Sequence, residues 1–237
     1  MNKTSPFTKQ PFQGFSPQGL KFLHNLNAHN NRDWFAKHRD DYLQFVSEPM
    51  KQLVMSLSPM ISELDPLVIT APNRAVSRIY RDTRFSNDKT PYRPRLWFAF
   101  KREVEYWTET PTYFFQLEEK QYMYGMGMYS ASAATMRRFR AMIDDNPEFF
   151  LRITEPVRKS RTLKLETDQY KRRLPFQYPE KYSITIDPWY QSKSIAVLAH
   201  REPDKTLLSS KLVNLLMEHF VLLKPLYDFL WKSVVLR

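Results

Sequence analysis

The sequence predicts an α+β protein in which a central antiparallel or mixed sheet is flanked by N-terminal and C-terminal helices. Apolar residues recur at three- and four-residue steps between residues 20 and 57, which is the period of an amphipathic helix. Short runs rich in β-branched and aromatic residues follow between residues 75 and 129, as in strands. A second apolar pattern of helical period begins near residue 205. Strands in the middle and helices at both ends are typical of this class.

Two helices are expected at the N-terminal end. Ser16 and Pro17 form a pair that is typical of an N-cap followed by proline at the first helical position, and the short helix should end near Asn27. Asn31 is expected to cap a second, longer helix. A kink or break is expected at Pro49 in that helix, because proline lacks the amide that bonds one turn back.

The middle of the chain is expected to supply the sheet. Residues 75–81 and 95–101 have the composition of strands and are joined by an irregular connection. Residues 113–117 and 122–129 are aromatic and methionine-rich, and the polar residues 118–121 separate them. This last pair predicts a β-hairpin.

Helices return after the hairpin. Ser130 or Ser132 is expected to cap a helix that runs through Ile143, and Asn146 starts another through about Thr154.

The last third of the chain mixes irregular, extended and helical patterns. Residues 156–180 are basic and irregular, whereas residues 183–186 and 194–198 are predicted strands. A long helix is expected from Lys205 to Pro225, which can open a final helix.

Length and composition predict one globular domain. The chain has 237 residues, of which 42% are apolar and 15% aromatic, so it can bury a large core. Since no stretch has the character of a linker, the expected domain covers residues 1–237, with residues 1–15 as a flexible N-terminal arm. The net charge of +11 favours anionic partners.

Some residue types are rare or missing, and this excludes several classes of binding site and structural feature. There is no cysteine, which excludes disulfides and thiolate metal sites and is consistent with the cytoplasm. No secretory signal or membrane-spanning segment is expected. With only four glycines, neither the Rossmann nor the P-loop glycine motif can be written. The five histidines have no zinc-site spacing, and His38 is expected to be a packed, hydrogen-bonded side chain.

The most charged stretch runs from Arg78 to Tyr92. Residues 74–102 contain nine Lys/Arg and two Asp, a net +7 out of the whole-chain +11. Such a concentration of cations predicts that the stretch holds an anion. It identifies neither the anion nor a reaction, so an enzyme and a binding protein are both open.

The fixed positions of this stretch are Arg78, Arg81, Asp82, Arg84, Phe85, Lys89 and Tyr92. Their spacing resembles the signature of the domain of unknown function 2461 family, whose members are mostly bacterial. The resemblance extends over most of the chain and implies a single domain of about this length with the motif at its centre. It implies no activity, cofactor or catalytic residue.

The residues themselves predict a small phosphorylated or anionic ligand. The expected ligand-binding side chains are Arg78, Arg81, Arg84 and Lys89. Asp82 would orient an arginine, or act as the catalytic base if its pKa were raised, and Tyr92 would contact the ligand.

A second segment is expected to add to this anion site. Gly125 and Gly127 leave one strand face bare, so that a ligand or another backbone can approach closely. A helix N-terminus follows, and Arg140 lies in that helix.

Two other classes of function stay open. In the first, the same arginines and the basic residues 171–173 bind nucleic acid, with interleaved aromatic residues as stacking partners. In the second, the motif is a structural ion-pair lock on an interaction scaffold. Metal dependence is open as well, because Asp82 and Asp88 could hold Mg²⁺ beside a phosphate.

Overall fold

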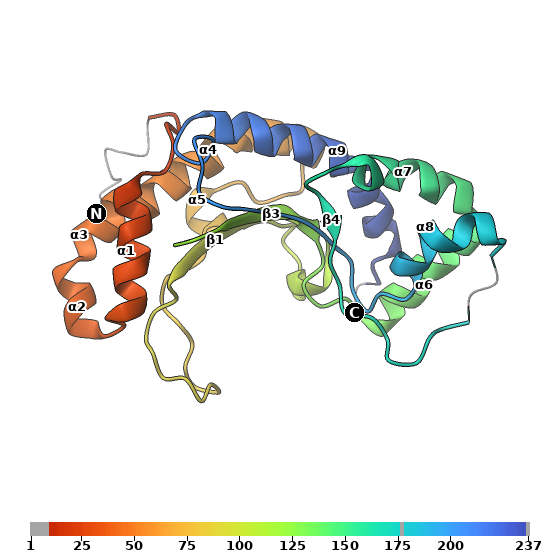
Figure 1. Cartoon of the computed structure of the whole chain (residues 1–237), viewed down its shortest axis with the longest axis horizontal. Helices are drawn as coiled ribbons and strands as arrows, with labels where there is room; N and C mark the ends of the chain where they lie inside the picture. Colours follow the sequence, from red (N-terminus) through yellow and green to blue (C-terminus); the bar gives the residue numbers. More distant parts are fainter. Residues whose placement is uncertain (1–9, 176–177, 236–237) are drawn as a thin grey trace. The chain divides into compact units, whose positions relative to one another are not determined.

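The computed structural model describes residues 10–175 and 178–235, and it is an α+β protein with helices flanking an antiparallel sheet (Figure 1). The predicted fold class is confirmed. The five strands lie in the order β1 (Arg95–Phe100), β2 (Thr112–Glu118), β3 (Tyr122–Gly127), β5 (Ala196–Arg201) and β4 (Lys164–Leu165). Strands β2 and β3 form the predicted hairpin.

The chain forms two compact units, and each is built from three segments. Unit 1 contains residues 1–100, 114–124 and 200–218, and unit 2 contains residues 101–113, 125–199 and 219–237. The strands β2, β3 and β5 therefore each begin in one unit and end in the other. The single domain expected for residues 1–237 stays a prediction.

Unit 1 contains the N-terminal helices. They are α1 (Pro17–Ala28), α2 (Arg32–Lys37), α3 (Arg39–Tyr42), the π-helical turn η2 (Leu43–Ser47), α4 (Glu48–Leu64) and α5 (Pro72–Ala75). Both predicted N-caps are confirmed, because the Gly19 amide donates to Ser16 Oγ at 3.2 Å and the Trp34 amide to Asn31 Oδ1 at 2.9 Å. The α4 helix packs against β1 (Figure 1).

The longer second helix is interrupted, contrary to the prediction of one helix. His38 separates α2 from α3, and its Nδ1 donates to the Trp34 carbonyl at 2.8 Å while its ring stacks on the Trp34 ring. The expected irregularity at Pro49 takes the form of the π-helical turn that ends at Ser47, just before α4 begins.

Residues near the N-terminus are packed into unit 1. The Phe12 and Phe15 side chains are buried, and the Phe15 ring stacks on Phe115 at 5.8 Å between centroids. The Phe12 amide donates to Ser56 Oγ, and the Phe15 amide to the Leu207 carbonyl. This part of the expected flexible arm is therefore packed rather than free, whereas residues 1–9 lie outside the described residues.

Unit 2 contains α6 (Ala133–Asp145), α7 (Pro147–Lys159) and α8 (Glu180–Tyr190). Ser132 caps α6, which decides between the two predicted caps. The strand predicted at residues 183–186 is wrong, since this run lies inside α8. The helix buries Ile186 and Trp189, which lie three residues apart and so on one helical face. This packing outweighs the preference of the short β-branched run for a strand.

The last helix, α9 (Lys211–Ser233), is one element that spans both units. Two predictions about it are wrong: it does not begin at Lys205, and Pro225 lies inside it rather than opening a new helix. Buried residues on both sides of the proline, such as Leu223 and Leu226, hold the helix together by packing. Across residues 10–175 and 178–235, no helix combines the length and hydropathy that a membrane span needs.

Candidate functional site

The charged stretch forms a hairpin of residues 76–98 in unit 1, which is called the basic hairpin below. Isolated bridges pair Val76 with Phe98 and Tyr80 with Tyr92. Figure 1 shows the hairpin, in yellow, extending from β1 beside α1 and α2. The continuous strand predicted at residues 75–81 is wrong, because these residues form bridges and not a regular ladder.

Prolines explain why the ladder is incomplete. Pro91 and Pro94 lie in the second arm of the hairpin, and neither has an amide to donate. Four steps separate the bridged positions Val76 and Tyr80, whereas six separate Tyr92 and Phe98. The second arm therefore bulges between the two bridges.

Arg81 braces the loop at the tip of the hairpin. Its Nη1 donates to Asp88 and to Thr90 Oγ1, the latter at 3.1 Å, and its Nη2 donates to Ser86 Oγ at 3.2 Å. Lys89 adds a further bond, from Nζ to the Thr83 carbonyl at 2.9 Å. Two of the predicted ligand-binding cations thus have partners inside the loop.

Asp82 and Arg84 form a two-pronged ion pair on the loop surface. Arg84 Nε donates to Asp82 Oδ1 at 3.0 Å, and Nη2 donates to Oδ2 at 2.7 Å. The hydrogen bonds from the Arg84 side chain and amide lower the pKa of Asp82 to about 2. A carboxylate with such a low pKa is a weak base. The two roles expected for Asp82, as an orienting residue or as a base, both stay predictions.

Asp88 is held in a similar way by the loop. Its carboxylate accepts from the Thr90 amide at 2.9 Å and from Thr90 Oγ1 at 2.8 Å, in addition to Arg81. These hydrogen bonds, those from Thr90 first, lower the pKa of Asp88 to about 2. Each carboxylate of the loop therefore has a cationic partner. No group of three or more His, Asp or Glu in the described residues is arranged to hold a metal ion.

The base of the hairpin is clamped to the rest of unit 1. Asn30 Nδ2 donates to the Tyr92 carbonyl at 2.9 Å, and the Tyr92 amide donates to Asn30 Oδ1 at 3.0 Å. The Tyr92 ring is buried and stacks on Phe35 at 4.1 Å, and this burial raises the pKa of Tyr92. Tyr92 therefore anchors the hairpin, and little of its ring is open to a ligand.

Arg93 ties the two arms together. Its Nη1 donates to the Arg78 carbonyl at 3.1 Å and to the Tyr80 carbonyl at 2.8 Å. Arg93 had no predicted role, and the bonds of Asn30 to the Tyr92 backbone were not predicted from the sequence. The sequence did contain a signal for the role of Arg93. Pro91 and Pro94 lie close to it on either side and lack the amides that would otherwise join the two arms.

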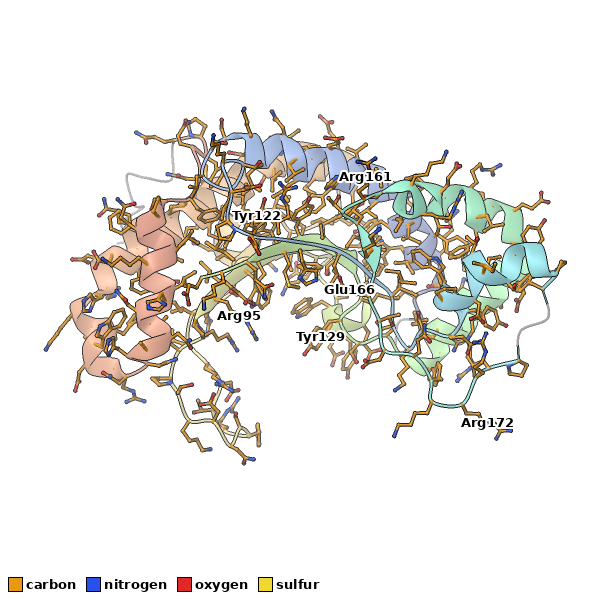
Figure 2. The ribbon with its side chains drawn as sticks, viewed as in Figure 1. Arg95, Tyr122, Tyr129, Arg161, Glu166 and Arg172 are labelled. Carbon is orange, nitrogen blue, oxygen red and sulfur yellow. The ribbon has the colours of Figure 1, made fainter. Side chains whose placement is uncertain are left out.

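The exposed groups of the hairpin are cationic and aromatic. Within the residues that the structure describes, the side chains of Arg78 and Arg95 are exposed and have no hydrogen-bond or ion-pair partner. Figure 2 shows Arg95 at the start of β1, where the hairpin joins the sheet. Phe85, at the tip, is 94% exposed, and Tyr80 is 58% exposed.

Arg140 has a different environment from the motif arginines. It belongs to unit 2, where it is 8% exposed, and its Nη1 donates to the Tyr190 carbonyl at 3.2 Å and the Ser192 carbonyl at 3.3 Å. Its guanidinium also lies over the rings of Tyr170 and Tyr190. These contacts make Arg140 a brace between α6 and the end of α8.

The bare glycine face is filled by backbone. A Cβ on Gly125 would lie 2.0 Å from the Val197 carbonyl oxygen, and one on Gly127 would lie 2.5 Å from the Ile195 carbonyl oxygen. Of the two alternatives expected for these glycines, close approach by another backbone is the one observed, and that backbone is β5.

The second basic run lies in unit 2. Lys171 and Arg172 are exposed, and Figure 2 shows Arg172 pointing outward from its loop. Arg173 pairs with Asp187 at 2.6 Å.

A comparison with protein families gives a match over most of the chain. No curated protein matches the sequence. The family model described as conserved hypothetical protein (DUF2461) matches residues 18–229, which is most of the chain and includes the basic hairpin. The chain therefore belongs to the DUF2461 family of conserved hypothetical proteins.

Proposed function

We propose that the basic hairpin binds nucleic acid in the cytoplasm, with its exposed cations on the phosphate backbone. The observation that carries the proposal is the division of the hairpin's cations into two sets. Arg81 and Arg84 hold the two carboxylates of the loop, whereas Arg78 and Arg95 are exposed without such a partner. Cations of the second kind can contact a polyanion without breaking any bond of the loop.

The electrostatic balance of the hairpin supports the same proposal. Residues 78–95 contain six Lys/Arg and two Asp, a net charge of +4 on one protruding element. Within the described part of the chain, Arg93 and Lys89 donate only to carbonyl groups, so no hydrogen-bonded carboxylate there neutralises their charges. A concentrated positive field attracts phosphates and speeds association with nucleic acid.

A small-anion pocket would require a rearrangement of the loop. In that alternative, Arg81 and Arg84 would turn from Asp88 and Asp82 to the ligand, which would leave both carboxylates without their partners. The present partners also keep the guanidinium groups apart on separate carboxylates. Nucleic acid requires no such exchange, and this difference makes it the better-supported ligand.

The test is the salt dependence of binding to fluorescein-labelled dT12, followed by fluorescence anisotropy between 50 and 400 mM NaCl. Four phosphate contacts predict a slope of about −3 for log Kobs against log salt concentration. The double variant R78Q/R95Q should weaken binding and make the slope shallower by about 1.4. The matched control K205Q/K211Q removes two exposed lysines of unit 1 and should leave the slope unchanged.

Two results would contradict the proposal. One is that the wild-type protein binds no oligonucleotide at 50 mM NaCl. The other is that the two double variants change the slope equally, because net charge and not the hairpin would then determine binding. Thermal stabilisation by a small phosphate compound, lost in R81Q and in R84Q, would instead support the small-anion pocket.

A further inference from the structure

We infer that the hairpin selects single-stranded nucleic acid, with Phe85 as a platform on which an unpaired base stacks. This inference rests on the proposed function and adds the class of nucleic acid. The observation behind it is the 94% exposure of Phe85, the highest among the exposed large hydrophobic residues of the described part of the chain. Exposed aromatic rings beside cations are typical of single-strand binding surfaces.

Phe85 is held outward by an ordered loop. The residues on both sides of it are fixed, because Arg84 bonds to Asp82 and the Ser86 hydroxyl accepts from Arg81. Lys89 closes the loop further by donating to the Thr83 carbonyl. A platform that is already ordered loses little conformational entropy when a base stacks on it.

Arg84 contributes to the same platform. Its guanidinium carbon lies over the Phe85 ring at 5.7 Å from the centroid, within cation–π range. Asp82 fixes this guanidinium through two hydrogen bonds. The ion pair of the loop therefore positions Arg84 beside the ring of Phe85, a residue that is 94% exposed.

Tyr80 offers a second stacking position on the same hairpin. It is 58% exposed, and its ring is held by Tyr92 at 5.3 Å and by Phe35 at 6.1 Å between centroids. Phe85 lies five positions after Tyr80 in the sequence, so their Cα atoms lie at most about 18 Å apart. Two rings within this distance can contact bases of one short strand.

The chemistry of phenylalanine argues against a duplex. A phenyl ring has no hydrogen-bond donor or acceptor, so in a groove it cannot read base edges by hydrogen bonds and is limited to apolar contact with the thymine methyl group. To insert between paired bases it must first unstack them, which costs a few kcal/mol per step. An unpaired base needs no such step. Phe85 should therefore favour single strands.

The experiment compares three labelled probes with the same protein at 50 and 200 mM NaCl: dT12, a 12-residue abasic strand and a 12-base-pair duplex. Phe85→Ala should weaken dT12 binding about 5- to 150-fold, the equivalent of 1–3 kcal/mol per stacked base. The same variant should bind the abasic strand as the wild type does and keep the same salt slope. Phe85→Trp should restore dT12 binding.

The matched control is Tyr129→Ala, which removes an 88% exposed aromatic side chain from unit 2 and should change no affinity. Thermal melting of each variant checks that it is folded. If the wild type binds dT12 and the abasic strand equally, with a steep salt slope, base stacking is overturned and the proposed function stands. If the duplex binds most tightly and Phe85→Ala weakens it, Phe85 is a wedge and not a single-strand platform. If no probe binds, both proposals fail.

Discussion

Asn30 holds both backbone polar groups of Tyr92. Its Nδ2 donates to the Tyr92 carbonyl at 2.9 Å, and its Oδ1 accepts from the Tyr92 amide at 3.0 Å. Because the Tyr92 side chain is buried against Phe35, the clamp joins the basic hairpin to the junction between α1 and α2. Asn30 is thus one of the groups that hold the hairpin in place, together with the stacking of Tyr92 on Phe35.

Asn30→Ala should lower the free energy of unfolding by about 2 kcal/mol, because the substitution leaves a part-buried donor and acceptor without partners. Urea denaturation measures the change. Asn27→Ala is the matched control, since Asn27 is exposed in α1 and alanine is the better helix former there. Equal stability of the two variants would show that the clamp contributes nothing.

The two carboxylates of the loop should titrate well below the usual range. The pKa values of Asp82 and Asp88 are lowered from 3.8 to about 2. A lowered folded-state pKa means that the ion pairs stabilise the loop fully above about pH 4 and are lost as the pH falls through about 2. Carboxyl ¹³C NMR titration should place both midpoints near 2, and midpoints near 3.8 would refute the pairing.

Separate variants should distinguish the causes of the two shifts. Arg84→Gln should raise the pKa of Asp82 and leave that of Asp88 low, because Asp82 and not Asp88 accepts the hydrogen bonds of Arg84. Thr90→Val should raise the pKa of Asp88 only in part, because it removes the bond from the Thr90 hydroxyl and keeps the bond from the Thr90 amide, which is the largest cause of the shift. An unchanged pKa of Asp88 in Thr90→Val would show that the hydroxyl contributes nothing to the shift.

Gly125→Ala should destabilise the protein by about 1–3 kcal/mol or more, as for overpacking in a core. The added Cβ would lie 2.0 Å from the Val197 carbonyl oxygen, so β3 and β5 would have to separate. Thermal melting measures the loss. Ser130→Ala changes an exposed residue just after the same strand and should leave the melting temperature unchanged. A stable Gly125→Ala variant would mean that β5 is not held close to β3.

Asp204 should be a stabilising residue of the segment after β5. It accepts from Tyr122 Oη, Arg201 Nη2 and the amides of Thr206 and Leu207. Partial burial raises the pKa of Asp204, but the hydrogen bonds from Arg201 and the Leu207 amide outweigh it and lower the pKa overall.

Asp204→Asn should therefore lower the free energy of unfolding by about 2 kcal/mol, because it weakens a charge-assisted bond. The difference from wild type should shrink as the pH falls through the lowered pKa of Asp204, since the wild-type carboxylate is then protonated. Urea denaturation at pH 7 and pH 3 provides the comparison. A difference that is the same at both pH values would contradict the role of the charge.

Sequence patterns predicted the fold class because much of the chain follows local rules. Ser16 and Asn31 cap helices through their own side chains, and residues 113–129 form a hairpin of two strands that are neighbours in the sequence. The failures concern segments whose local signals are short or weak. Residues 183–186 are too few to show a period, and the packing of Ile186 and Trp189 decided for a helix.

In the candidate site, too, some features followed from the sequence and others did not. The sequence by itself determined that cations are concentrated between residues 74 and 102 and that Asp82 stands two residues from Arg84, close enough to pair. Only the tertiary structure decided that Arg140 is buried among carbonyls, that Tyr92 faces inward and that Phe85 faces solvent. The physical reason is that exposure depends on which distant segments cover a side chain, and local spacing carries no information about them.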